Sequence, residues 1–189
     1  MELLKKRILA EGKVIGEDVL KVDMFLNHQI DVGLLGEIGR EFYTRFAGEN
    51  INKILTVEAS GIGIACITAQ QFSVPVVFAK KGYNRNVGND IFLSDVFSFT
   101  KGVNTQIGVS RNYIGPDDRV LVIDDFLANG EAVNGLIGII NQAGATLCGV
   151  GIVIEKGFQQ GGRLLREKGV HLESLVIIKS MKGGKIEFV

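Results

Sequence analysis

Short apolar runs alternate with amphipathic stretches along most of the chain. The runs lie at residues 54–57, 74–79, 119–123, 149–154 and 175–178. Apolar residues recur every three or four positions at 35–46 and 133–140, which predicts helices that pack one face on a sheet, and a shorter helix is expected at 160–168. Strands that alternate with helices are typical of an α/β protein with a parallel sheet. We therefore predict one doubly wound domain over residues 1–189.

Two segments depart from this alternation. Residues 1–32 are mixed in character, with apolar and charged positions interspersed. Residues 80–105 begin with a polar and basic stretch and continue with an apolar stretch that has no clean period. Since long connections in compact domains often carry function, we interpret 80–105 as a flexible loop or a β-hairpin.

Composition narrows the class of protein. Hydrophobic residues make up 46% of the chain and charged residues 22%, which excludes an intrinsically disordered protein. Basic and acidic residues number 21 each, so no broad positive field favours nucleic acid or an anionic membrane. Charges interrupt the apolar residues at the start of the chain, and no apolar run reaches membrane-spanning length, so we expect a soluble, cytoplasmic protein.

The cysteine and histidine counts limit the chemistry. Cys66 and Cys148 are far apart in sequence, and we expect both to be buried, reduced thiols. His28 and His171 are the only histidines, which excludes a metal site built from several histidines and disfavours a Ser-His-Asp triad. The sequence predicts no dedicated set of metal ligands.

The strongest chemical signal follows the strand at 119–123. Asp124 and Asp125 come directly after it, and residues 128–132 lead into the next helix. Adjacent side chains of an extended chain point to opposite sides, so one carboxylate can bind a sugar diol while the other acts through water or a metal ion. Free backbone amides at the helix start form an anion site. A helix-capping aspartate and a glycine in a tight turn explain either aspartate alone equally well, but the whole run favours a phosphorylated sugar.

This run resembles the 5-phosphoribosyl-1-pyrophosphate (PRPP) motif of the type I phosphoribosyltransferases. The usual loop of that family reads Ala-Thr-Gly-Gly-Thr, with two hydroxyl donors that are missing here. The corresponding residues of this chain are Ala128, Asn129, Gly130, Glu131 and Ala132. The sequence Phe-Leu-Ala-Asn-Gly at 126–130 is similar to that of the xanthine phosphoribosyltransferases.

The resemblance implies a fold and an assembly. The expected fold is α/β, a type I phosphoribosyltransferase-like parallel sheet flanked by helices. A small N-terminal hood at 1–32 would bind the base, and 80–105 would be a flexible flap. Members of the family are typically homodimers, so the resemblance also implies a homodimer.

The loop at 58–63 resembles the family's pyrophosphate loop. The resemblance implies that Ala59, Ser60 and Gly61 contact the leaving group and that a non-proline cis peptide joins Ala59 to Ser60. Taken alone, Ser-Gly before a helix is common capping chemistry. Its place after a strand favours the functional interpretation.

Cationic side chains head the segment at 80–105. Two adjacent lysines are by default solvated. The functional interpretation is that Lys80, Lys81 or Arg85 closes over the pyrophosphate, since mobile cations suit a transient polyanion. We assign Lys81 to the candidate pyrophosphate site.

The base site combines the strand end at 155–157 with the N-terminal segment. Lys156 matches the position that contacts the base in xanthine phosphoribosyltransferases, and Leu20 and Asn27 match two further base-binding positions. A lysine can donate to an exocyclic oxygen and favours the anionic form of an acidic purine. Leu20 would pack on the purine face, and the Asn27 amide can donate and accept at its edge. Without the resemblance, these three would be a surface lysine, a core residue and a turn residue.

The implied reaction is purine salvage, the transfer of phosphoribosyl from PRPP to N9 of xanthine. Asp124 and Asp125 would hold the ribose hydroxyls and stabilise positive charge, and 128–132 would bind the 5′-phosphate. Mg²⁺ would be carried mainly by PRPP or pyrophosphate. Two alternatives stay open: another purine base (hypoxanthine, guanine or adenine), or a non-catalytic PRPP-sensing regulator. The neutral charge and the lack of length for a separate DNA-binding domain disfavour the regulator.

Overall fold

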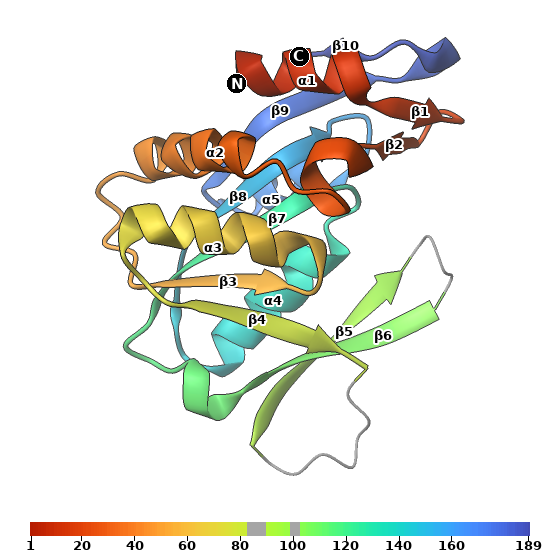
Figure 1. Ribbon diagram of the computed structural model, residues 1–189. Helices are drawn as coiled ribbons and strands as arrows, with labels where there is room; N and C mark the ends of the chain where they lie inside the picture. The colour runs from red at the N-terminus through yellow and green to blue at the C-terminus, as the bar shows by residue number, and fades with distance from the viewer. Residues whose placement is uncertain (83–89, 99–102) are drawn as a thin grey trace.

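The computed structural model describes residues 1–82, 90–98 and 103–189, which form a mixed sheet between two layers of helices (Figure 1). The central strands are parallel, and β10, β6 and β5 pair in antiparallel fashion at the two edges. In spatial order the strands of this sheet are β10 (Glu187–Phe188), β9 (Leu172–Ser180), β8 (Thr146–Lys156), β7 (Arg119–Leu127), β3 (Lys53–Val57), β4 (Val76–Lys81), β6 (Val103–Ser110) and β5 (Ile91–Ser98).

Helices cover both faces of the sheet, so its central strands are apolar on both sides. On one face lie α1 (Glu2–Glu11), α2 (Val32–Arg45) and α3 (Ser60–Phe72), and on the other lie α4 (Glu131–Gln142) and α5 (Gly161–Glu167). Single 3-10 turns lie at Arg111–Tyr113 and Lys182–Gly184. The buried stripe of α4, which includes Val133, Leu136 and Ile140, confirms the helix predicted from its apolar spacing.

The N-terminal segment forms a hood beside the carboxyl ends of β7 and β8 (Figure 1). It consists of α1, the two-stranded sheet of β1 (Lys13–Ile15) and β2 (Val19–Lys21), and a π-helical turn at Asp23–Asn27. Apolar side chains from each part, including Leu4, Ile8 and Phe25, are fully buried in the same cluster as α2 and α3. The hood is therefore packed onto the main domain by a continuous apolar core.

The segment at 80–105 contains the end of β4 and most of an antiparallel hairpin. Strands β5 and β6 pair along their whole length, and β6 also pairs with Lys80 and Lys81 of β4. The hairpin packs on α4 at Gly135, where a Cβ atom would lie 2.6 Å from Val96 Cγ2. Only glycine allows this close approach, so the hairpin is held against the helix that follows the loop at 128–132.

The two cysteines differ in their burial, although both were expected to be buried. Cys66 is exposed, not buried, because it falls outside the buried stripe of α3, which runs through Ile64, Ala65 and Ala69. Cys148 is buried as expected, and burial raises the pKa of its thiol. None of the helices in the described part of the chain could span a membrane.

Candidate active site

The two adjacent aspartates lie within β7, because this strand continues to Leu127 instead of ending at Ile123 as predicted. The strand continues because its backbone still pairs with β8: Asp124 lies opposite Ile152, and Leu127 lies opposite Glu155. Asp124 is 5% exposed, whereas Asp125 is half-buried. The two side chains differ in burial but still interact: Asp124 Oδ1 accepts from the Asp125 N–H at 3.1 Å, and each carboxyl group shifts the pKa of the other.

Both carboxyl groups are harder to ionise than ordinary aspartates. Burial, and then the negative charge of Asp125, raise the pKa of Asp124 well above its usual value. Burial also raises the pKa of Asp125, against hydrogen bonds from the Phe126 amide and the Asn27 side chain. The Asn27 amide group donates to Asp125 Oδ2 at 3.0 Å, and the Phe126 N–H donates to Oδ1 at 2.9 Å. A positive charge placed beside the pair would favour its ionised form.

The residues predicted to bind phosphate, 128–132, form the turn from β7 into α4, and we call them the phosphate loop. Gly130 adopts φ = 90°, in the region that favours glycine, and its carbonyl accepts from the N–H and the side-chain amide of Asn134. A cavity of about 510 Å³ opens in front of the whole loop and is also lined by Lys81, Phe97 and Thr105. Free amides at the start of a helix favour a bound anion, so this cavity is a candidate anion site.

The loop after β3 approaches the acidic pair from the neighbouring strand. The cis peptide joins Glu58 to Ala59, one bond before the predicted position, because the Ala59–Ser60 bond already leads into α3. A Cβ atom at Gly61 would overlap the Thr56 hydroxyl and lie 3.2 Å from Asp124 Oδ1. Ala59 is exposed and Ser60 is half-buried at the point where the backbone enters α3.

Of the two candidate cations that the structure describes, Lys81 lies nearer the acidic pair than Lys80. The Glu58 carboxylate accepts from the Lys81 N–H at 2.6 Å, and the positive charge of Lys81 opposes the rise in the pKa of Asp124. Lys80 instead extends over the Phe78 ring, at 6.0 Å from its centroid. Arg85 lies outside the described residues.

The predicted base-binding residues come from the hood and from the end of β8. The Lys156 ammonium donates to the Asp18 carbonyl of the hood at 2.6 Å and lies 5.8 Å from the Phe126 ring centroid. Burial lowers the pKa of Lys156. Asn27 Oδ1 is buried and has no hydrogen-bond partner among the described residues. Leu20 is 6% exposed and belongs to the apolar core that the hood shares with α2 and α3.

The ends of β3, β4 and β8 and the hood therefore lie around the acidic pair of β7. No protein-family model matches the chain. A curated xanthine phosphoribosyltransferase from Ruminiclostridium cellulolyticum is 62% identical over 188 residues, which cover 100% of this chain and 99% of the relative. Another, from Clostridioides difficile, is 54% identical over 189 residues and 100% of both chains. The chain belongs to the xanthine phosphoribosyltransferase family.

Solved structures of more distant proteins share the fold of this xanthine phosphoribosyltransferase family member. Adenine phosphoribosyltransferase from Giardia lamblia, complexed with 9-deazaadenine, superposes with a TM-score of 0.76 at 20% identity, over 92% of this chain and 97% of that one. The Trypanosoma brucei enzyme gives a TM-score of 0.75 at 20% identity, over 92% and 79%. The predicted type I phosphoribosyltransferase fold is confirmed, with antiparallel strands added at both edges of its parallel sheet.

Sequence reasoning missed two residues that shape the site in this family member. Phe126 lies two positions after Asp124 on the same strand and brings its ring beneath the Lys156 ammonium. Glu58 ties the loop after β3 to the end of β4 through the Lys81 amide. Side chains two positions apart on a strand share a face, so the position of Asp124 could have revealed Phe126. No sequence signal marks the contact of Glu58 with Lys81.

Proposed function

We propose that this protein transfers the phosphoribosyl group of PRPP to N9 of xanthine and releases xanthosine 5′-monophosphate and pyrophosphate. Membership of the xanthine phosphoribosyltransferase family supports this reaction. The observation that carries it is the acidic pair at the end of β7, which lies between the phosphate loop and the hood. In this arrangement a bound sugar phosphate and a base would meet at the acidic pair.

The acidic pair would act on the ribose. As the bond from C1 to pyrophosphate breaks, its electron pair leaves with the pyrophosphate and positive charge develops on the ribose ring. The N9 lone pair then forms the new bond on the opposite face, and the proton of N9, where present, passes to solvent. Asp124 and Asp125 have raised pKa values and gain most from a nearby cation, so they stabilise this transition state more than the ground state.

The phosphate loop would hold the 5′-phosphate. The residues Ala128, Asn129, Gly130, Glu131 and Ala132 present backbone N–H groups at the start of α4, in the cavity that they share with Lys81. Fixing this phosphate places C1 against the acidic pair, which is the positioning effect that accelerates a reaction between two bound substrates.

The leaving pyrophosphate would lie against the loop after β3. Backbone groups of Ala59, Ser60 and Gly61 are the proposed contacts, and Lys81 adds positive charge at the end of β4. These groups neutralise charge that grows as the bond breaks.

Xanthine would bind between the hood and Phe126. Lys156 offers only hydrogen-bond donors, which suit an exocyclic oxygen, and Asn27 Oδ1 is a buried acceptor for a ring N–H. The ring of Phe126 supplies an apolar surface for stacking, and Leu20, at the edge of the hood's apolar core, would pack on the purine face as proposed from the sequence. A base that satisfies both polar groups replaces the Lys156 contact to Asp18.

Mg²⁺ fits this site as a companion of the substrate. In the described ranges, no three His, Cys, Asp or Glu side chains gather in a way that could hold a metal ion. The acidic pair offers hard oxygen ligands, but burial disfavours its charged form. Bound through the phosphate oxygens of PRPP, the ion would supply positive charge that neutralises the leaving group.

We further propose a homodimer in the cytoplasm that uses PRPP and xanthine as its substrates and has no nucleic-acid or membrane partner, as expected from the sequence. Light scattering on the purified protein at several concentrations tests the assembly. A mass of one chain, 20.5 kDa, at every concentration would contradict the dimer.

The deciding experiment is pyrophosphate release with PRPP, Mg²⁺ and each of xanthine, guanine, hypoxanthine and adenine. Release that is strongest with xanthine is the expected result. Strong release with another base would keep the mechanism and overturn the specificity. Measurable PRPP binding without release for any base would identify a PRPP-sensing regulator instead.

A further inference from the structure

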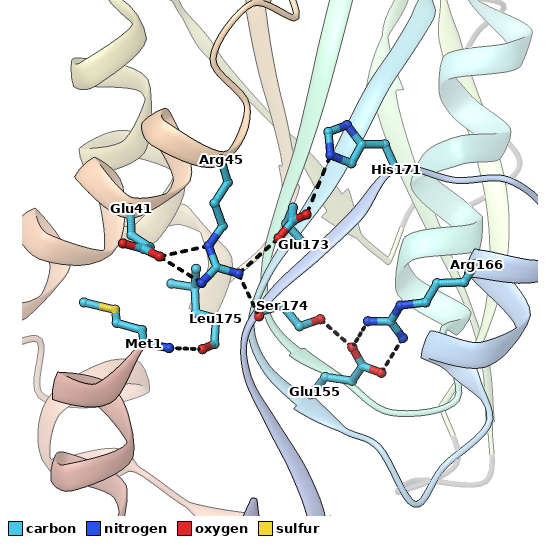
Figure 2. Close-up of polar contacts among 9 residues, drawn as sticks. All are labelled: Met1, Glu41, Arg45, Glu155, Arg166, His171, Glu173, Ser174 and Leu175. Carbon is cyan, nitrogen blue, oxygen red and sulfur yellow. Dashed lines mark hydrogen bonds and ion pairs between the residues drawn. The ribbon is translucent and has the colours of Figure 1, made fainter. Parts of the chain in front are cut away.

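Glu155 is a buried carboxylate at the end of β8, beside the proposed base-binding Lys156, and it is 3% exposed. Arg166 of α5 donates two parallel hydrogen bonds to it, from Nη1 to Oε1 at 2.8 Å and from Nη2 to Oε2 at 2.7 Å. The Ser174 hydroxyl of β9 donates to Oε2 as well (Figure 2). Although burial works against ionisation, these hydrogen bonds hold the pKa of Glu155 below its usual value. The pair is therefore charged, bidentate and fixed in orientation.

Helix α5 packs directly on Glu155 through a glycine. A Cβ atom at Gly162 would overlap Glu155 Oε1 and lie 2.8 Å from Arg166 Nη1. The helix has seven residues, which is too short to be stable without tertiary contacts. The Glu155–Arg166 pair and the buried Leu165 side chain are the contacts that fix its orientation on the sheet.

The first residue of α5 in turn supports the phosphate loop. The Gly161 N–H donates to the Ala128 carbonyl at 3.0 Å. A Cβ atom at Gly161 would overlap the Ala128 oxygen and lie 2.7 Å from both Asn129 C and Gly130 N. The backbone of the loop thus rests on the backbone of α5, with no side chain between them.

We propose that Glu155 is a positioning residue for the 5′-phosphate. Its ion pair with Arg166 holds α5 in place, and α5 holds the phosphate loop at Gly161. This inference rests on the proposed function. It gives the end of β8 two roles, one in the PRPP site through Glu155 and one in the base site through Lys156. Lys156 extends to the hood and contacts the base, whereas Glu155 extends to α5 and supports the phosphate loop. Loss of Glu155 should therefore weaken PRPP binding and leave the base site intact.

Figure 2 also contains a matched control, the neighbouring ion pairs of Arg45. Arg45 donates to Glu41 Oε1 at 2.8 Å and to Glu173 Oε2 at 3.0 Å, and it reaches the Ser174 carbonyl at 3.2 Å. These contacts join α2 to β9 and do not touch α5 or the phosphate loop. Glu173→Gln removes a carboxylate that is hydrogen-bonded to Arg45, and its charge acts on Arg166 without a hydrogen bond. Glu155→Gln instead removes the carboxylate to which Arg166 is hydrogen-bonded.

The test measures PRPP affinity by calorimetry, with Mg²⁺ and without base, together with the KM for xanthine. Glu155→Gln should raise the Kd for PRPP about tenfold or more, because small displacements of a positioning loop are costly. The KM for xanthine should stay within about twofold in the same assay, and Glu173→Gln should change neither quantity. Gly161→Ala, which displaces the loop directly, should reproduce the selective loss. The double variant should lose less than the product of the two single effects, since both act on one loop.

Three results would overturn the proposal: an unchanged PRPP Kd in folded Glu155→Gln, an equal loss for PRPP and xanthine, or an equal loss in Glu173→Gln. Where Glu155→Gln does not fold, Gly161→Ala decides by the same criterion. A wild-type protein that binds no PRPP would contradict the proposed function instead. Amide hydrogen exchange at 128–130 then tests directly whether Glu155 holds the phosphate loop in place. Faster exchange in Glu155→Gln than in Glu173→Gln supports the proposal, and equal exchange in the two variants overturns it.

Discussion

Replacing Asp125 by asparagine should separate the needs of catalysis from those of stability. The side chain keeps its size and loses one negative charge beside Asp124. The Phe126 N–H can still donate to the new amide oxygen. Asn27, which now donates to Asp125 Oδ2, can turn its amide so that its unpartnered Oδ1 accepts from the new NH₂ group. The local hydrogen bonds therefore survive the substitution.

The effect on turnover follows from the lost charge. Two opposite charges about 4 Å apart interact by about 4 kcal/mol at an effective dielectric constant of about 20. Each 1.4 kcal/mol of transition-state stabilisation is about tenfold in rate, so full loss of this interaction lowers kcat by roughly 10³. Because the positive charge on the ribose develops only as the bond to pyrophosphate breaks, PRPP affinity should change much less.

Stability should move in the opposite direction. The pKa of Asp125 and that of Asp124 are raised in the folded protein above the ordinary value of 3.8. Groups with raised folded pKa values stabilise the fold at low pH, and this stabilisation is lost as pH rises from the unfolded toward the folded pKa. Asp125→Asn removes one of the two groups and lowers the pKa of the other. The Tm of the variant minus the Tm of the wild type should therefore increase as pH rises.

The assays are steady-state pyrophosphate release and thermal unfolding from about pH 4 to about pH 8. Asp95→Asn serves as the control, because Asp95 is an exposed aspartate of β5 that accepts a hydrogen bond from the Gln106 side chain. We expect it to alter neither kcat nor Tm. Near wild-type turnover in Asp125→Asn would refute the role of the acidic pair. A fall in Tm that grows with pH would refute the argument from the raised pKa values.

Three further predictions concern the other parts of the site. Lys156→Met keeps the apolar stem over Phe126 and loses the charged donor, so the KM for xanthine should rise by about 10- to 100-fold while the calorimetric PRPP Kd stays unchanged. Gly130→Ala forces a side chain into φ = 90°, which costs about 1–2 kcal/mol, and PRPP should bind roughly tenfold more weakly by calorimetry. Chelation of Mg²⁺ should abolish pyrophosphate release reversibly and leave Tm unchanged in scanning calorimetry, since the described residues contain no metal cluster.

The parallel core could be predicted because its signals are local. Strands β3, β7 and β8 are apolar on both faces, and the helices that follow them repeat apolar residues every three or four positions. Adjacent carboxylates after such a strand indicate a site at its carboxyl end. The sequence predicts an end of β7 four residues too early, because polar side chains at 124–125 are typical of a loop, although their backbone still pairs with β8.

The hood and the edges of the sheet could not be predicted in the same way. In α1 only Leu4 and Ile8 are buried, so its apolar pattern is too sparse to indicate a helix. The strand β10 has two residues and exists only through its pairing with β9. Contacts such as Asn27 to Asp125, which are 98 positions apart, depend on the packing of the hood and leave no local signal.

The base preference must come from these long-range contacts, because the fold does not decide it. Adenine phosphoribosyltransferases share this fold at 20% identity. In this chain Asp125 engages the Asn27 NH₂ group, which leaves Oδ1 as a buried acceptor, while Lys156 can only donate. A base that presents an exocyclic oxygen and a ring N–H satisfies both groups, as xanthine does. Adenine would set its exocyclic amine against an ammonium or leave both groups unpaired. Sites built on buried hydrogen bonds reject such analogues by roughly 10⁴-fold, so in the proposed site the acidic residue that is assigned to the ribose would also help to select the base.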